Sequence, residues 1–180
     1  MKIALLSLPS GPLEVEESEN RRRLNQLIAV ANGLGELVVP GQAIAEPRKS
    51  DNALWMAQGL QGGGSLSAPR TRLDGAAGAV VGAVVTFAST AIVAGLDFAA
   101  GVTLKAGSVT TFNNCQFRQD GVPALVTCES GALATFVGCH FHGTPTQVVD
   151  NPGAIGNITV VGCANLTGAG LGNVTAVGSV

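Results

Sequence analysis

The chain has 180 residues, of which 46% are apolar and 12% charged, so it can bury a core and is not expected to be disordered. The net charge of −2, with one dense basic run at Arg21-Arg22-Arg23, argues against nucleic acid as a partner. No stretch reaches the ~18 apolar residues of a membrane helix, so we expect no membrane partner.

The N-terminal part, residues 1–67, is predicted to form an arm that contains one helix. The helix covers about residues 13–32, where four glutamates precede a run of arginines in the order that the helix dipole favours. Asn32-Gly33 supplies its stop. This helix either packs on its own domain or docks in a trimer.

Residues 37–40 are predicted to form a short strand. After them, residues 47–64 mix polar residues with Trp55 and a run of three glycines, which indicates a linker or an arm. Such segments commonly become ordered only against a partner. Residues 1–67 are therefore expected to be a docking region, and residues 68–83 a connector to the C-terminal half.

The C-terminal half, residues 84–180, contains a 24-residue repeat. Three segments, residues 111–117, 135–141 and 159–165, share a pattern in which a cysteine follows Asn or Gly. Repetition at this length indicates a solenoid, and short runs of Thr, Val and Phe between Gly and Asn predict strands rather than helices. The sequence therefore predicts a mainly β protein with a parallel β-helix of about four rungs.

Each rung is predicted to contain three short strands, because inward and outward residues alternate within three columns of the repeat. The inward parity slips between the second and third strands, which requires a corner. Asn and Gly tolerate a left-handed backbone, so this corner is placed at Asn114, Gly138 and Gly162, with another near Gly107 and Gly131. The predicted rung core consists of Phe112, Cys115, Phe117, Cys128, Phe136, Cys139, Phe141, Val160 and Cys163.

The end of the repeat differs in spacing. Residues 172–178 echo residues 156–162, but at a shorter spacing than the cysteines have. This predicts a final, incomplete rung.

The four cysteines could belong to a zinc site, a disulfide framework or a core. No two of them have the ~2–4 intervening residues of a zinc knuckle, and three follow the 24-residue period. We interpret them as reduced core residues, since a small thiol fills a ladder of stacked side chains with good dispersion contacts.

Clustered catalytic groups are not evident in the repeat. Catalysis on a β-solenoid needs carboxylates or bases gathered on one outward face, whereas Asp97, Asp120, Glu129 and Asp150 fall at different corners. We therefore predict that the protein is not an enzyme and that it uses no cofactor.

The segments Phe-Asn-Asn-Cys-Gln-Phe at residues 112–117 and Phe-Val-Gly-Cys-His-Phe at residues 136–141 resemble rungs of right-handed parallel β-helices, a group that includes pectin-degrading enzymes and phage tailspikes. The resemblance covers roughly residues 84–180 and implies the right-handed winding. Pectin-degrading members carry aspartate and arginine clusters that this sequence lacks, and tailspike depolymerases have many more rungs. A short solenoid behind a helical arm resembles instead the trimeric decoration proteins and head fibres of tailed phages.

This resemblance implies a homotrimeric virion protein that decorates and stabilises a bacteriophage capsid. Its N-terminal region would dock to the major capsid protein or another virion protein, and its β-helix would project from the outer surface of the capsid. Trimerisation would also cover the open ends and strand edges that a short solenoid leaves. The alternative is a receptor-binding tail fibre or small tailspike that recognises a host-surface glycan.

His140 and His142 are the candidate metal ligands of the chain. Residues two apart on a strand point the same way, so three chains would bring six imidazoles to one axis. The metal-bearing spike tips of phage tails resemble this arrangement, but those sites lie at a tapered chain end, whereas the repeat continues past His142 to Cys163. No metal site is therefore predicted.

Overall fold

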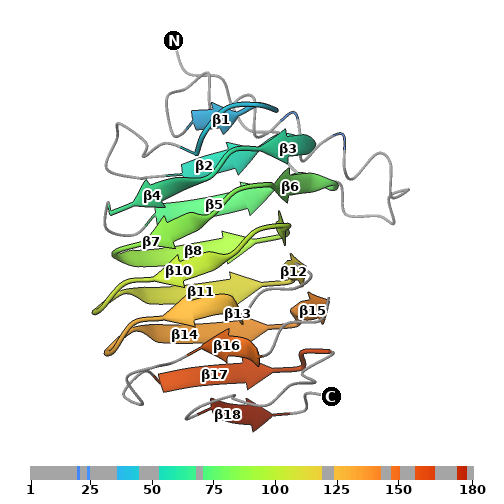
Figure 1. Ribbon diagram of the computed structural model, residues 1–180. Coiled ribbons are helices and arrows are strands. Elements are labelled where there is room, and N and C mark those ends of the chain that lie inside the picture. Colours follow the sequence, from blue (N-terminus) through green and yellow to red (C-terminus); the bar gives the residue numbers. More distant parts are fainter. Residues whose placement is uncertain are drawn as a thin grey trace.

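The computed structural model describes residues 20, 24, 36–44, 53–67, 71–118, 124–142, 147–150, 157–164 and 174–177. In these residues the chain winds into a β-solenoid, with strands of successive turns side by side (Figure 1). All strand pairs among them are parallel. The predicted parallel β-helix is confirmed, while its right-handed winding and the trimer stay predictions.

Three parallel sheets form the walls of the solenoid. The eight-stranded sheet contains β1 (Glu36–Val38), β2 (Ala53–Met56), β5 (Thr71–Gly75), β8 (Thr90–Ala94), β11 (Val109–Asn113), β14 (Leu133–Val137), β17 (Asn157–Val161) and β18 (Val174–Val177). The β3–β15 sheet contains β3 (Gly59–Gln61), β6 (Ala79–Val81), β9 (Asp97–Phe98), β12 (Gln116–Arg118) and β15 (His140–His142). The β4–β16 sheet contains β4 (Gly64–Leu66), β7 (Val85–Phe87), β10 (Val102–Leu104), β13 (Ala124–Cys128) and β16 (Gln147–Asp150).

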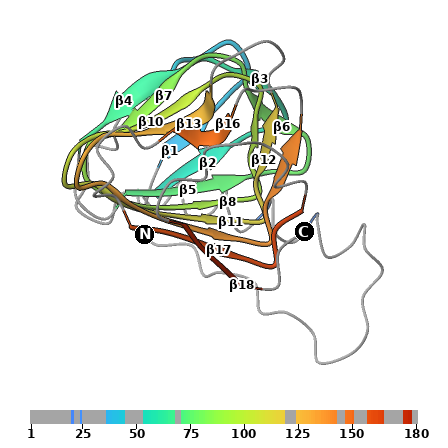
Figure 2. The ribbon, with the colours of Figure 1, turned by 60° about the horizontal axis from the view of Figure 1, so that its bottom comes forward.

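Five turns contribute one strand to each of the three sheets, from β2, β3 and β4 to β14, β15 and β16, where the sequence predicted about four rungs. Figure 2, turned towards the solenoid axis, shows the three walls around a common interior. β17 and β18 continue the eight-stranded sheet below these turns. Ile158 pairs with Val174, closer along the chain than the partners in the turns before it, which confirms that the predicted echo of residues 156–162 adds a further strand to the stack.

The 24-residue spacing belongs to only some of the described turns. Val109 pairs with Leu133 and Leu133 with Asn157, so these turns have the spacing of the cysteines. Thr90 pairs with Val109, so the turn before them is shorter. The longer turns have longer connections from the β3–β15 sheet to the β4–β16 sheet. The 24-residue spacing of the cysteines is therefore the length of the shorter turn plus an insertion between the β3–β15 sheet and the β4–β16 sheet.

The solenoid begins upstream of the predicted start at Val84. β2 pairs with β5, and β5 with β8, so much of the predicted linker and connector consists of turns in the same stack. The sequence interpretation failed there because these turns lack the 24-residue spacing and because the glycine run suggested flexibility. Instead, a Cβ on Gly63 would overlap the Val84 carbonyl oxygen, and one on Gly64 would overlap that of Ile44. These glycines allow neighbouring backbones to approach closely.

The described residues test only part of what was predicted for the N-terminal region. The strand predicted at residues 37–40 is found as β1, Glu36–Val38. Asn20 and Leu24 are helical, and the other residues of the predicted helix lie outside the described part of the chain.

Aligned side chains fill the interior as ladders. Phe112 pairs with Phe136, and Phe117 with Phe141, and the rings in each pair stack with centroids 5.1 and 5.2 Å apart. An edge-to-face contact of 5.3 Å between Phe112 and Phe117 joins the two ladders, a geometry that aromatic pairs favour. All nine residues of the predicted rung core are at most 2% exposed.

The predicted corners have left-handed backbone conformations. The φ angles are 51° at Asn114, 60° at Gly138 and 58° at Gly162, which follow β11, β14 and β17. At the second corner, φ is 77° at Gly107 and 82° at Gly131. This conformation costs most residues about 1–2 kcal/mol, which explains why Asn or Gly stands at each corner.

The substitution Gly63→Ala is expected to lower the free energy of unfolding by about 1–3 kcal/mol, because the new Cβ overlaps backbone of the next turn. Urea unfolding followed by circular dichroism measures the change. Ser65→Ala, at an exposed position of β4, is the control and should stay within ~0.5 kcal/mol. A flexible linker would give the opposite result, since alanine there would be neutral or stabilising by ~0.4–1 kcal/mol.

Candidate functional site

The eight-stranded sheet exposes an apolar surface. Five large outward side chains on β8, β11, β14 and β17 are 36–50% exposed, namely Ile92, Val109, Leu133, Val137 and Val161. Between them runs a row of half-buried threonines that the strand register aligns, namely Thr111, Thr135 and Thr159. No described outward side chain on these four strands is charged. We call the outward residues of β8, β11, β14 and β17 the apolar face.

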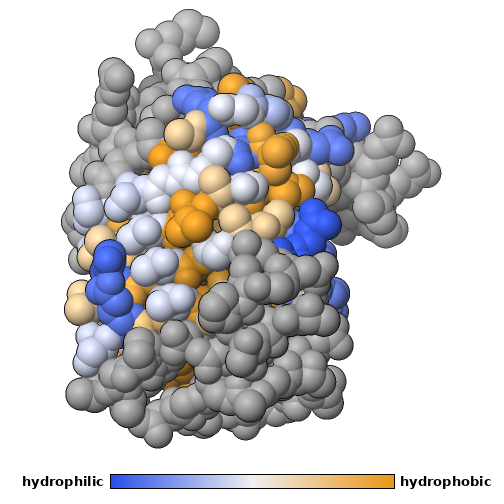
Figure 3. Space-filling view, viewed as in Figure 1, coloured by the Kyte–Doolittle hydropathy of each residue, from blue (hydrophilic) through white to orange (hydrophobic). Residues whose placement is uncertain are grey.

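The β4–β16 sheet presents hydroxyl groups instead. Ser65, Thr86, Thr103 and Thr127 lie in one register row across β4, β7, β10 and β13. In Figure 3 the surface over these strands is mostly pale, with a few strongly hydrophilic residues at its margins. This wall therefore offers weak hydrogen-bonding groups in single file and no concentrated charge.

The β3–β15 sheet gathers the polar groups in its C-terminal half. Its outward row runs from Leu60 and Val80 through Asp97 and Gln116 to His140. A second outward position on the last two strands holds Arg118 and His142, which pair in register. The two predicted metal-ligand candidates thus lie together on one outward face, beside a glutamine and an arginine.

Two of the carboxylates considered as catalytic groups are held by basic side chains. Arg118 donates to both carboxylate oxygens of Asp97, each over 2.8 Å. Lys105 pairs with Glu129 across neighbouring turns, and the Ala106 N–H also donates to that carboxylate over 3.1 Å. The Lys105 hydrogen bond is the main reason that the pKa of Glu129 lies below its usual value. Asp120 and the side chain of Asp150 lie outside the described part of the structure.

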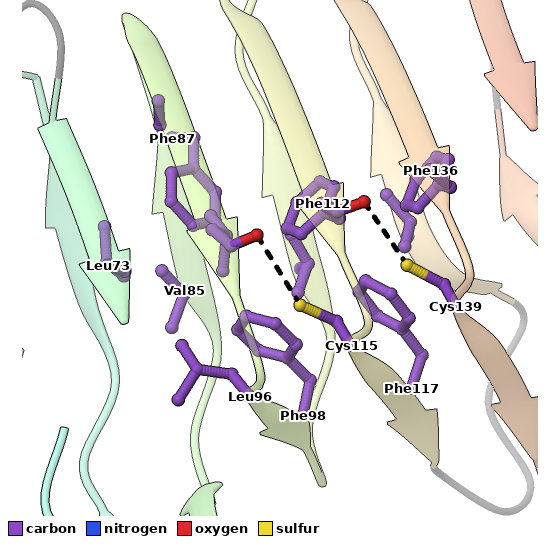
Figure 4. Close-up of a cluster of buried hydrophobic side chains, with 14 of the residues drawn as sticks. Leu73, Val85, Phe87, Leu96, Phe98, Phe112, Cys115, Phe117, Phe136 and Cys139 are labelled. Atoms are coloured by element: carbon purple, nitrogen blue, oxygen red, sulfur yellow. Dashed lines mark hydrogen bonds between the residues drawn. The ribbon is translucent and has the colours of Figure 1, made fainter. Parts of the chain in front are cut away.

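The cysteine column is a buried ladder of thiols, and none of the four cysteines forms a disulfide. The Cys139 thiol donates to the carbonyl oxygen of Phe112 in the preceding turn, over 3.4 Å (Figure 4). The Cys163 thiol makes the equivalent bond to Phe136 over 3.5 Å. Each sulfur therefore fills core space and also binds the wall of the turn before it.

The pKa values of the thiols in this column depend on contact between neighbouring thiols and on burial. Contact with the Cys115 thiol, together with burial, raises the pKa of Cys139, and the same contact lowers the pKa of Cys115. Burial raises the pKa of Cys163. A thiolate is the form that attacks reagents and binds metals, so a buried thiol with a raised pKa is unreactive.

Two further kinds of site are absent from the described residues. No three His, Cys, Asp or Glu side chains there come close enough together to hold a metal ion. No helix in that part of the structure is long and apolar enough to cross a membrane.

The corner column extends one turn further than predicted. Gly95 has a φ of 66° and precedes the buried Leu96, just as Asn114 precedes Cys115. The signal in the sequence is Gly-Leu-Asp-Phe at residues 95–98, which matches Asn-Cys-Gln-Phe at residues 114–117 at the spacing of the shorter turn. A search at the fixed period of the cysteines could not detect it.

Comparison of the chain with protein-family models, with curated proteins and with solved structures finds no match.

Native protein is expected to resist thiol reagents, because all four sulfurs are buried. Treatment with DTNB should release almost no thionitrobenzoate within minutes in buffer and four equivalents per chain in urea. Absorbance at the thionitrobenzoate band measures both. Rapid labelling of any cysteine in the folded chain would contradict the buried ladder.

Proposed function

We propose that the chain is a non-enzymatic structural protein of a bacteriophage particle, in which three right-handed solenoids associate through their apolar faces. The apolar face carries the proposal. Contiguous apolar surface without charge commonly marks a site of association. Here the inner side is covered by the Phe and Cys ladders, and the outer side presents Ile, Val and Leu side chains without charges. Other copies of the chain would cover that side.

The size of the apolar face suits the centre of an interface between copies. Its four strands, ~4.8 Å apart and ~16 Å long, span a flat area of about 300 Å². A standard interface takes ~800 Å² from each partner, so in the proposed trimer the apolar face is the uncharged central part of a larger contact. Copies related by symmetry bring the same uncharged surface to the axis, so no like charges oppose one another.

The solenoid suits a projecting part of a particle, because each turn is hydrogen-bonded to the next along the whole stack. In the proposed particle it stands on the outer surface of the capsid, and the N-terminal segment binds the major capsid protein. Since the stack already includes β1, we narrow the proposed docking segment from residues 1–67 to residues 1–35. The ion-paired state of Asp97 and Glu129 supports a role without catalysis.

Substitution of Leu133 by Asp is expected to convert a trimer into monomers. Leu133 is 39% exposed on the apolar face, and three carboxylates brought together at one axis would repel one another and lose water. Thr103→Asp, on the β4–β16 sheet, is the matched control and should leave the trimer intact. Sedimentation equilibrium at micromolar concentration measures the mass. A monomeric wild-type chain, or a trimer unaffected by Leu133→Asp, would refute the interface.

The position of the protein on a particle tests the capsid role. Antibodies to the solenoid should label many sites over the capsids of particles from a lysate that contains the protein. Deletion of residues 1–35 should abolish this labelling while the shortened chain stays trimeric. Labelling of a few sites at the tail, with glycan binding by the isolated chain, would favour the receptor-binding alternative. Absence from every particle would overturn the viral role and leave the fold untouched.

A further inference from the structure

His140 and His142 project from β15 on the outward face of the β3–β15 sheet, and both are exposed. Their rings are nearly parallel, with an interplanar angle of 17° and centroids 5.9 Å apart. They are the only two histidines of the chain. A short strand hydrogen-bonded to its neighbour holds their backbones at a fixed separation.

The surroundings of the pair leave it open to a cation. Arg118, the register neighbour of His142, turns its guanidinium to the preceding turn, where both carboxylate oxygens of Asp97 lie 2.8 Å from its nitrogens. Its charge is therefore compensated. Gln116 lies beside His140 on one side, and the small Ala164 lies beside it on the other.

We infer that His140 and His142 chelate one divalent transition-metal ion, each through one imidazole nitrogen, with water at the remaining positions. A bound metal lies along the nitrogen lone pair, in the plane of each ring. With metal–nitrogen bonds of ~2.0–2.1 Å and ~1.1 Å from nitrogen to ring centre, two imidazoles at the ~90–109° angles of octahedral and tetrahedral ions have centroids ~4.5–5 Å apart. The two rings are 5.9 Å apart and nearly parallel, so chelation requires both exposed side chains to rotate and direct one nitrogen each at the ion. The sequence argued against a metal only for a site shared by three chains at an axis, whereas this site needs one chain.

The donor set selects the class of metal. Imidazole suits Zn²⁺, Cu²⁺ and Ni²⁺, whereas Mg²⁺ and Ca²⁺ prefer carboxylate and carbonyl oxygens. The nearest carboxylate in the described part of this wall, Asp97, is already bound to Arg118. The site therefore takes a borderline transition metal, and it does not depend on the proposed role in a particle.

Isothermal titration of the full chain with Ni²⁺ tests the site, because Ni²⁺ does not oxidise thiols as Cu²⁺ can. The protein must be purified without a histidine tag. We expect one ion per chain. Loss of a residue that only hydrogen-bonds to a metal ligand typically weakens metal binding ~10–100-fold. Loss of a ligand itself should cost no less, so His140→Ala and His142→Ala should each weaken Ni²⁺ binding at least ~10-fold.

The controls separate chelation from other binding. Thr103→Ala, on the β4–β16 sheet, should bind Ni²⁺ as the wild type does, and circular dichroism should show that both histidine variants stay folded. The double variant should lose the site. No binding, binding that survives both substitutions, or one ion shared by two or three chains would each overturn the inference.

Discussion

In-register parallel pairing between successive turns is the constraint on which the rest of this structure depends. Each residue lies beside its counterpart one turn away, so an inward position becomes a ladder and an outward position becomes a row. Within a ladder, Phe112 lies beside Phe136, and Phe117 beside Phe141. Where a smaller residue lies beside a phenylalanine, as Val93 does beside Phe112, other side chains must fill the space, because an unfilled cavity is destabilising.

The same pairing explains why cysteine is suited to its column. After the left-handed corners at Asn114, Gly138 and Gly162 the core holds a small side chain, whereas the larger Leu96 follows the corner at Gly95. A thiol is small, polarisable and a weak hydrogen-bond donor. Cys139 and Cys163 use that donor to bind the carbonyl oxygens of Phe112 and Phe136, which links each corner to the preceding wall. The regular spacing of the cysteines, which could have indicated a metal site or disulfides, is therefore explained by the packing of the core.

The three walls differ in chemistry because each outward row is independent of the core behind it. The apolar face presents Val, Leu and Ile, while β5 of the same sheet carries the ion pair Arg72–Asp74. The β4–β16 sheet presents a line of hydroxyl groups, and the β3–β15 sheet presents both imidazoles and the ion pair of Arg118 with Asp97. Association of copies through the first wall leaves the third wall available to solvent. The proposed trimer and the proposed metal site can therefore succeed or fail separately.

Sequence alone determined the parallel solenoid, its three strands per turn and its Asn and Gly corners, because a repeated spacing and special backbone conformations leave direct marks on residue choice. It did not reveal β2 to β6, which precede the predicted start at Val84, since turns of varying length without a loop insertion share no period with the cysteines. Nor did it reveal the apolar face, because both faces of strands such as Leu133–Val137 carry apolar residues. Only the stacking of turns decided that the outward ones form one continuous uncharged surface, and that Arg118 binds Asp97 on a diagonal, away from His142.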